Sequence, residues 1–143
     1  MITYGYTILY VEDVEATLAF YVKAFGFTQK FITPEKDYSE LETGGTTLAF
    51  ALYSVAEFNG IAIEKRKPEA SPSPFEITFV SDDIESAWKQ AVEAGAEIVK
   101  EPAQIPGVKP SATSATSMVF WSKYVRKLIQ NNRMTKQGRK KLK

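Results

Sequence analysis

The 143-residue sequence contains neither cysteine nor histidine. Without cysteine, no disulfide can form and no thiolate can act as a nucleophile or as a metal ligand. Without histidine, a zinc, nickel or iron site would have to be built from oxygen ligands, mainly carboxylates. These two absences disfavour disulfide, thiolate and transition-metal chemistry.

Long apolar runs are also absent. No stretch approaches the roughly 20 apolar residues that cross a bilayer, and the N-terminus has no basic and apolar signal segment. We therefore expect a cytoplasmic protein with no membrane partner. At this length one domain with a sizeable apolar core is expected.

Charge is distributed unevenly along the chain. Residues 1–101 hold all 17 acidic residues and 8 basic ones, a net charge of −9, whereas residues 102–143 hold 10 basic residues and no acid. The basic end carries no base-reading motif, so a solvated tail is expected and nucleic acid is not expected as a partner.

A strand followed by a helix is predicted for residues 7–25. Residues 7–11 are β-branched and aromatic, and the apolar positions of residues 14–25 recur with the period of a helix. Asp13 is a suitable N-cap, and Gly26 is expected just after the helix C-terminus. Further strands are expected at residues 27–33, 37–42 and 46–53, which completes a βαβββ module.

The same pattern returns 70 residues later. Asp83 and Glu85 fall on Asp13 and Glu15 at this constant offset, and the apolar helix positions coincide as well. The chain therefore contains a two-copy internal repeat. One helix covers one face of each small sheet, so the other face needs a partner or a ligand.

These residues resemble a known superfamily. The segments ILYVED (residues 8–13), FY (20–21), FGF (25–27), FEITFVSDDI (75–84) and AGA (94–96) are similar to those of the vicinal-oxygen-chelate superfamily, which includes glyoxalases, bleomycin-resistance proteins and dioxygenases. The resemblance implies an α+β fold of two βαβββ modules that form a cup, usually within a homodimer. We expect this domain at residues 1–106, with module one at 1–60 and module two from 73 to 106 onward.

The family pattern stops after residue 106. Permitted codons for residues 107–124, read one nucleotide out of frame, encode WGQTVGYVRDINGFLVEI, which resembles the expected family ending. Our hypothesis is a single-nucleotide frameshift near residues 105–107, which leaves the last two strands of module two altered or missing. A natural basic extension is the alternative for residues 107–143, and the gene sequence across these codons would decide between the two.

The altered segment permits two structures. Residues 118–131 place their apolar side chains on one helical face, and we favour a helix there. Residues 117–124 are also aromatic and β-rich enough to form a replacement strand.

The resemblance also indicates where metal ligands would lie. By position they correspond to Tyr6, Phe50, Glu76 and a lost glutamate near Ser122 or Lys123. Only Glu76 is a good ligand, whereas a transition metal needs about three. We therefore predict no metal and no cofactor.

An aromatic and acidic cup remains as the candidate ligand site. Strand alternation, combined with the family positions, assigns to it Tyr6, Ile8, Tyr10, Phe50, Leu52, Glu76 and Thr78. A carboxylate among aromatic rings suits a cationic or hydrogen-bond-donating ligand. Alternatively, Tyr6 and Phe50 fill the cup as core residues, and Glu76 pairs with a lysine or a tyrosine hydroxyl.

Two classes of function follow. The first is a metal-independent protein that binds a cationic or aromatic small molecule, and we expect it to be a homodimer because open sheet edges favour pairing. The second is a metal-dependent lyase, isomerase or dioxygenase, or an inactive frameshifted derivative of one. No catalytic residue can be assigned from the sequence.

Overall fold

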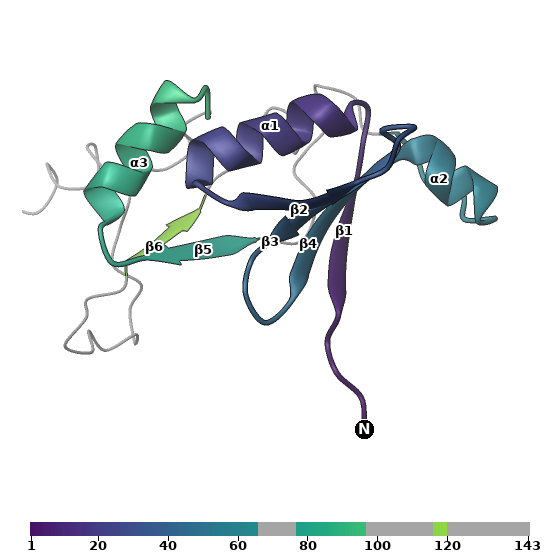
Figure 1. Ribbon diagram of the computed structural model, residues 1–143, viewed down its shortest axis with the longest axis horizontal. Helices are drawn as coiled ribbons and strands as arrows, with labels where there is room; N and C mark the ends of the chain where they lie inside the picture. The colour runs from purple at the N-terminus through teal and green to yellow at the C-terminus, as the bar shows by residue number, and fades with distance from the viewer. Residues whose placement is uncertain (66–76, 97–115, 120–143) are drawn as a thin grey trace, which may run out of the picture.

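The computed structural model describes residues 1–65, 77–96 and 116–119 (Figure 1). In chain order the elements are β1 (Tyr6–Val11), α1 (Val14–Phe25), β2 (Thr28–Ile32), β3 (Tyr38–Glu42), β4 (Thr47–Leu52), α2 (Tyr53–Phe58), β5 (Thr78–Ser81), α3 (Ile84–Glu93) and β6 (Thr116–Val119). The predicted strand, helix and three strands of module one are therefore confirmed, and the short helix α2 is an addition to them.

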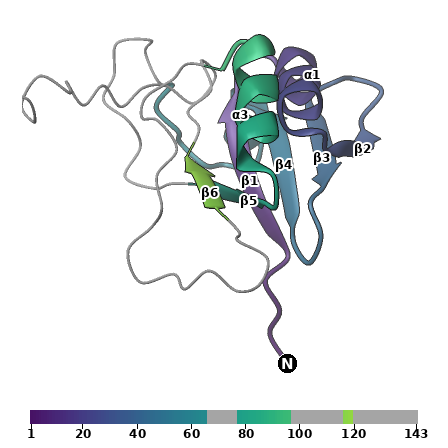
Figure 2. The same cartoon turned by 90° about the vertical axis from the view of Figure 1, so that its left-hand side faces the viewer.

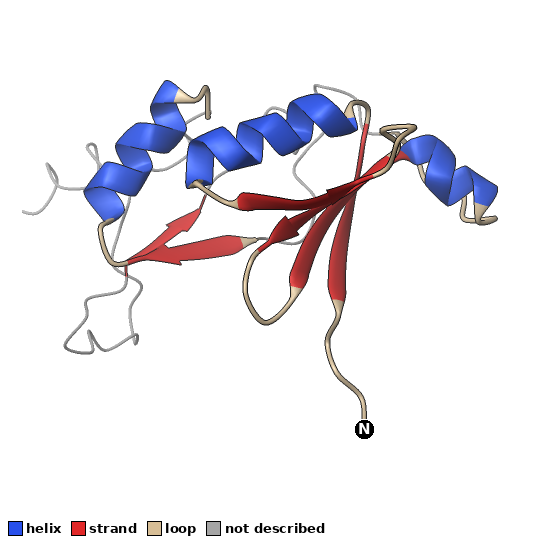
Figure 3. Cartoon of the chain, in the orientation of Figure 1, coloured by secondary structure: helices blue, strands red, loops and turns tan. Residues whose placement is uncertain are grey.

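The first five elements form one βαβββ unit. Strands β1 to β4 make a sheet in the order β1-β4-β3-β2, in which β1 runs parallel to β4 and the other neighbours are antiparallel. Helix α1 makes the crossover between β1 and β2 and lies against one face of this sheet (Figures 1 and 3). The opposite face of the sheet is called the open face below.

Helix α1 begins and ends at the residues that the sequence predicts. The Asp13 carboxylate accepts a 2.9 Å hydrogen bond from the Ala16 amide, which satisfies one of the unpaired donors of the first turn. Gly26 ends the helix with a φ of 71°, where a side chain would be strained, and its amide donates to the Val22 carbonyl.

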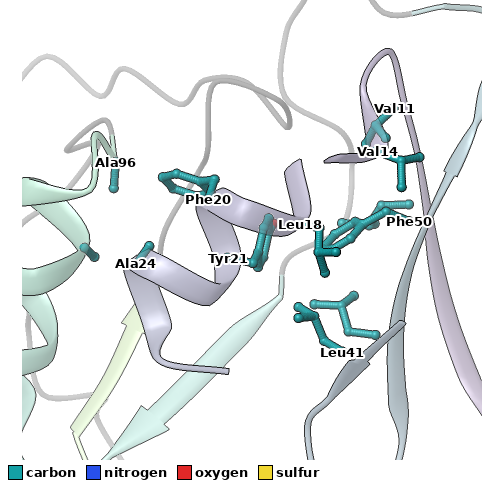
Figure 4. Packing of buried hydrophobic residues seen from close by; sticks show 12 residues of the cluster. Val11, Val14, Leu18, Phe20, Tyr21, Ala24, Leu41, Phe50 and Ala96 are labelled. Carbon is teal, nitrogen blue, oxygen red and sulfur yellow. The ribbon is translucent and has the colours of Figure 1, made fainter. Parts of the chain in front are cut away.

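The core lies between α1 and the sheet. Leu18 and Tyr21 of α1 are buried against Leu41 of β3 and Phe50 of β4 (Figure 4). The Tyr21 and Phe50 rings lie 4.8 Å apart, centre to centre. This apolar layer fixes which face of every strand points toward the helix.

The second copy of the repeat packs beside the first. Helix α3 packs beside the C-terminal end of α1 (Figures 1 and 2), and its N-cap is Asp83, whose carboxylate accepts a 3.0 Å hydrogen bond from the Ser86 amide. The Gln90 side-chain amide donates a 2.8 Å bond to the Lys23 carbonyl of α1. From β5, Phe79 packs on Phe25, with ring centres 4.8 Å apart. The aromatic core therefore continues from one copy into the other.

Strand β6 corrects one prediction. We favoured a helix over residues 118–131, but Met118 and Val119 belong to β6, which pairs antiparallel with β5. The strand alternative is right for these residues, because β5 gains a hydrogen-bonding neighbour and Thr116 and Val119 are β-branched. Residues 120–131 lie outside the described part of the chain. In module one β1 pairs parallel with β4, whereas β5 pairs antiparallel with β6 in the described part of the second copy.

No helix within the described ranges is both long enough and apolar enough to span a bilayer.

Candidate functional site

Strand register assigns residues to the open face. Cross-strand partners share a face, so three rows follow from the pairing of β1, β4 and β3. The rows are Tyr6–Thr47–Glu42, Ile8–Ala49–Glu40 and Tyr10–Ala51–Tyr38. The central strand β4 therefore contributes small side chains, whereas β1 and β3 contribute large ones on either side of it.

The three predicted site residues of β1 lie together on the open face. Tyr6 is 54% exposed, Ile8 is 41% exposed and Tyr10 is half-buried. Ala49 and Ala51 on the neighbouring central strand are fully buried. Along β1 the open face is thus lined by aromatic and aliphatic side chains. Whether these residues bind a ligand stays a prediction.

Two predicted site residues lie on the other side of the sheet. Phe50 pairs with Leu9, is fully buried and packs on Tyr21 of α1. Leu52 lies two residues after Phe50 on β4, so it shares the same face, and it packs against the same core. Their placement in the cup was therefore wrong, because it followed the family position of Phe50, whereas the register that pairs Phe50 with Leu9 puts both side chains toward the helix. The alternative, that Tyr6 and Phe50 fill the cup as core residues, is also not what the structure has: Phe50 is a core residue on the helix side, and Tyr6 is 54% exposed.

Of the two predicted residues of the second copy, the structure describes Thr78 alone. Thr78 lies on β5 and pairs with Val119 of β6, in a sheet separate from the first one. Its side chain is exposed. Glu76 lies outside the described residues.

A β-bulge adds two residues to the open face that sequence reasoning missed. The register of β2 against β3 shifts between Gln29 and Phe31, so Phe31 pairs with Glu40 and Lys30 becomes the extra residue. Phe31 is 48% exposed. The Lys30 ammonium reaches across the same face to Glu40. The bulge thereby turns an apolar ring and a cation toward the open face.

Glu40 is the polar centre of the open face. Its Oε1 accepts a 3.0 Å hydrogen bond from the Tyr38 hydroxyl, and its Oε2 lies 3.1 Å from Lys30 Nζ. The Glu40 side chain is only 14% exposed, whereas that of Lys30 is 44% exposed. Lys30 Nζ also lies 3.4 Å from Thr47 Oγ1 on β4. Each carboxylate oxygen therefore has one partner, one neutral and one cationic.

These contacts shift the titration of two groups. Burial, followed by the hydrogen bond to Glu40 and its charge, raises the pKa of Tyr38 to about 12. The hydrogen bond to Glu40 and the charge of that carboxylate raise the pKa of Lys30 above its usual value. At neutral pH the site therefore holds a protonated phenol and an ammonium group on one carboxylate.

A sequence signal for Glu40 existed. The segment 37–42 is expected as a strand, and its alternation places Ser39 and Leu41 on one face and Tyr38, Glu40 and Glu42 on the other. With Leu41 assigned to the core, Glu40 must face away from the helix. The partner Lys30 could not be found in this way, because the bulge breaks the alternation of β2.

Two of the positions at which the family resemblance places metal ligands lie on opposite faces of the sheet. Tyr6 lies on the open face, but Phe50 is a buried hydrocarbon side chain on the opposite face. Within the described residues no three acidic side chains gather closely enough to share a metal ion. This part of the chain therefore does not supply the ligand set that a transition metal needs.

A small pocket lies on the helix side of the molecule. Its volume is about 130 Å³, and it opens between α1, α3 and β5, lined by Ala24, Phe25, Phe27, Phe79, Ser81, Ala87 and Gln90. The Gln90 amide in its wall is bonded to α1 through Lys23. It marks the junction of the two repeats.

The sequence matches the family model of the Glyoxalase/Bleomycin resistance protein/Dioxygenase superfamily over residues 3–108. The chain belongs to this superfamily. The match ends two residues after Pro106. The domain end at residue 106 and the frameshift near residues 105–107 stay predictions. No curated protein sequence matches the chain significantly.

Solved structures with the same fold come from several bacteria. A glyoxalase/bleomycin resistance protein/dioxygenase family enzyme from Burkholderia phytofirmans is 22% identical, with a TM-score of 0.56 over 71% of this chain and 80% of that one. A glyoxalase/bleomycin resistance protein/dioxygenase from Nocardioides is 23% identical, with a TM-score of 0.57 over 74% and 70%. An integron cassette protein from V. cholerae is 19% identical, with a TM-score of 0.55 over 88% and 91%. At such identities the likeness is one of fold, and the superfold hosts several functions.

Proposed function

We propose that this protein binds a small aromatic compound that carries a positive charge, on the open face and without a metal ion. One observation carries the proposal. The mostly buried carboxylate of Glu40 lies beside the half-exposed ring of Phe31, in a layer that also contains Tyr6. Aromatic rings offer stacking area, and the carboxylate offers a charge-assisted hydrogen bond.

The charge of the domain supports a cationic ligand. Residues 1–101 carry a net charge of −9, which raises the local concentration of cations and favours their encounter with the protein. A cation above the tyrosine and phenylalanine rings also gains a cation–π attraction. Binding without turnover, as in sequestration, needs only these contacts.

A binding assay tests the proposal directly. Proflavine, a planar aromatic cation with N–H donors, is titrated by fluorescence, and its effect on the unfolding temperature is measured; 1-naphthalenesulfonate serves as the anionic comparison. Proflavine should raise the unfolding temperature and the anion should not. The recovered dye should be chemically unchanged. No shift at saturating proflavine would contradict the proposal.

A matched pair of variants locates the site. Glu40→Gln keeps the shape and removes the charge, so proflavine affinity should fall by about tenfold or more. Glu15→Gln removes an acid that is also paired with a lysine, at 2.6 Å from Lys36, but lies on α1. This control should leave proflavine binding unchanged.

Metal analysis separates the proposal from its alternative. A metal-dependent lyase, isomerase or dioxygenase would purify with, or take up, a stoichiometric transition metal. We expect none, and a stoichiometric metal bound by this chain would contradict a metal-independent site.

Dimer formation is part of the same proposal. In the described part of the chain β1 is the outer strand of its sheet, and its sequence YTILYV contains no charge and no proline to discourage pairing. A second copy of the chain is the partner we expect. Sedimentation should show a dimer at micromolar concentration, whereas a pure monomer would contradict this part.

A further inference from the structure

Lys30 extends across the open face from the outer strand β2 toward the centre of the sheet. Its ammonium nitrogen lies 3.1 Å from Glu40 Oε2 on β3 and 3.4 Å from Thr47 Oγ1 on β4. One side chain therefore reaches over three neighbouring strands. Its ammonium group contacts the Glu40 carboxylate, which is the group that the proposed ligand would bind.

We propose that Lys30 is a built-in competitor for the ligand, and that the ligand's cationic group displaces the Lys30 ammonium from Glu40 Oε2. This inference rests on the proposed function, because it describes how the same site is filled. The exchange replaces one cation by another, so Glu40 never remains buried and unpaired.

The two partners of Glu40 differ in how easily they can leave. Tyr38 lies two residues away on the same strand, is half-buried and keeps its hydroxyl on Oε1 at 3.0 Å. Lys30 lies at a bulge of the outer strand, and its side chain is 44% exposed. Displacement therefore affects Oε2, while Oε1 stays bonded and holds the carboxylate in position.

A second acid can receive the displaced ammonium. Glu42 lies two residues beyond Glu40 on β3, faces the same side of the sheet and is exposed. Its charge already acts on Lys30. The Lys30 side chain is itself 44% exposed, so water and Glu42 can take up its ammonium group once it leaves Glu40.

Selectivity follows from this exchange. A neutral aromatic compound can stack on the rings but cannot replace an ammonium group on a carboxylate. A compound with a cationic N–H donor can do both. Removing Lys30 should therefore strengthen the binding of such a cation, which is the opposite of what the loss of a merely structural residue would do.

The test measures the dissociation constant of proflavine for the full chain and for K30Q, E40Q and the double variant K30Q/E40Q. We expect K30Q to bind about two- to fivefold more tightly, because the lysine end of the pair is 44% exposed and its release into water costs little. The gain should vanish in the E40Q background. K36Q, which removes a lysine paired with Glu15 on another surface, should bind as the unmodified chain does.

Each other result has a distinct meaning. If the unmodified chain binds proflavine and K30Q binds equally or more weakly, the competitor role is wrong and the proposed function stands. If the gain persists without Glu40, Lys30 acts by its long-range charge and displacement is wrong. If the unmodified chain does not bind proflavine, both proposals fail. The unfolding temperature of ligand-free K30Q verifies that the variant is folded.

Discussion

The Tyr38 hydroxyl donates a 3.0 Å hydrogen bond to Glu40 Oε1, between residues that lie two positions apart on β3. The two side chains stand on the same face of the strand, so the phenol and the carboxylate are neighbours. The contact leaves Glu40 Oε2 to Lys30. It also makes Tyr38 a reporter of the site.

Tyr38 should ionise late in an alkaline titration. Burial and the bond to Glu40 raise its pKa from about 10 to about 12. The difference in near-ultraviolet phenolate absorbance between the protein and Tyr38→Phe isolates this residue from the other tyrosines. In Glu40→Gln the pKa should fall but stay raised, because burial remains.

The same shift predicts a loss of stability at high pH. The folded-state pKa lies above the unfolded value, so the contribution of Tyr38 is complete below pH 10 and is lost as the pH rises to about 12. The free energy of unfolding, measured with urea at a series of pH values between 10 and 12, should fall more steeply with pH for the unmodified protein than for Tyr38→Phe. Parallel curves would mean that Tyr38 ionises equally easily in both states.

Two buried hydroxyls should respond oppositely to removal. Ser39 and Thr17 are both fully buried, but Ser39 Oγ has no hydrogen-bond partner among the residues that the structure describes, whereas Thr17 Oγ1 donates a 2.6 Å bond to the Asp13 carbonyl. Ser39→Ala should leave the free energy of unfolding unchanged or raise it by up to ~1 kcal/mol. Thr17→Val should lower it by about 1 kcal/mol. Urea unfolding measures both, and an equal loss in the two variants would contradict the argument.

The N-cap of α1 should be worth a measurable amount. Asp13→Ala removes the acceptor of the Ala16 amide and should lower the free energy of unfolding by about 1 kcal/mol. Asp13→Ser should retain most of this stabilisation, because a serine hydroxyl can also accept the bond. Asp82→Ala, which changes an exposed acid that makes no capping bond in α3, is the control. If Asp13→Ser costs as much as Asp13→Ala, charge and not capping is responsible.

Much of module one could be predicted from the sequence because its signals are local. Asp13 and Gly26 mark the ends of α1 by side-chain and backbone chemistry within a few residues, and the alternation in β1 separates Leu9 from Ile8 without further information. The repeat of these signals at Asp83 located α3 equally well.

The site was less predictable because it depends on register between distant strands. Phe50 could be assigned to the correct face only by knowing that it pairs with Leu9, and Lys30 only by knowing the bulge at Gln29 and Phe31. Neither the pairing nor the bulge can be recognised from the residues of one strand alone. The strand β6 depends in the same way on β5, which lies far from it in sequence.

The two faces of the sheet give the last prediction. Tyr6→Leu changes a half-exposed ring on the open face, so the free energy of unfolding should stay within about 0.5 kcal/mol while proflavine affinity falls by about two- to tenfold. Phe50→Leu changes a ring packed on Tyr21, so it should lower stability by about 1–3 kcal/mol. The Phe50 variant, measured where it is folded, should bind proflavine as the unmodified chain does. If Phe50→Leu weakens binding as much as Tyr6→Leu, the ligand contacts the helix side and the open face is not the site.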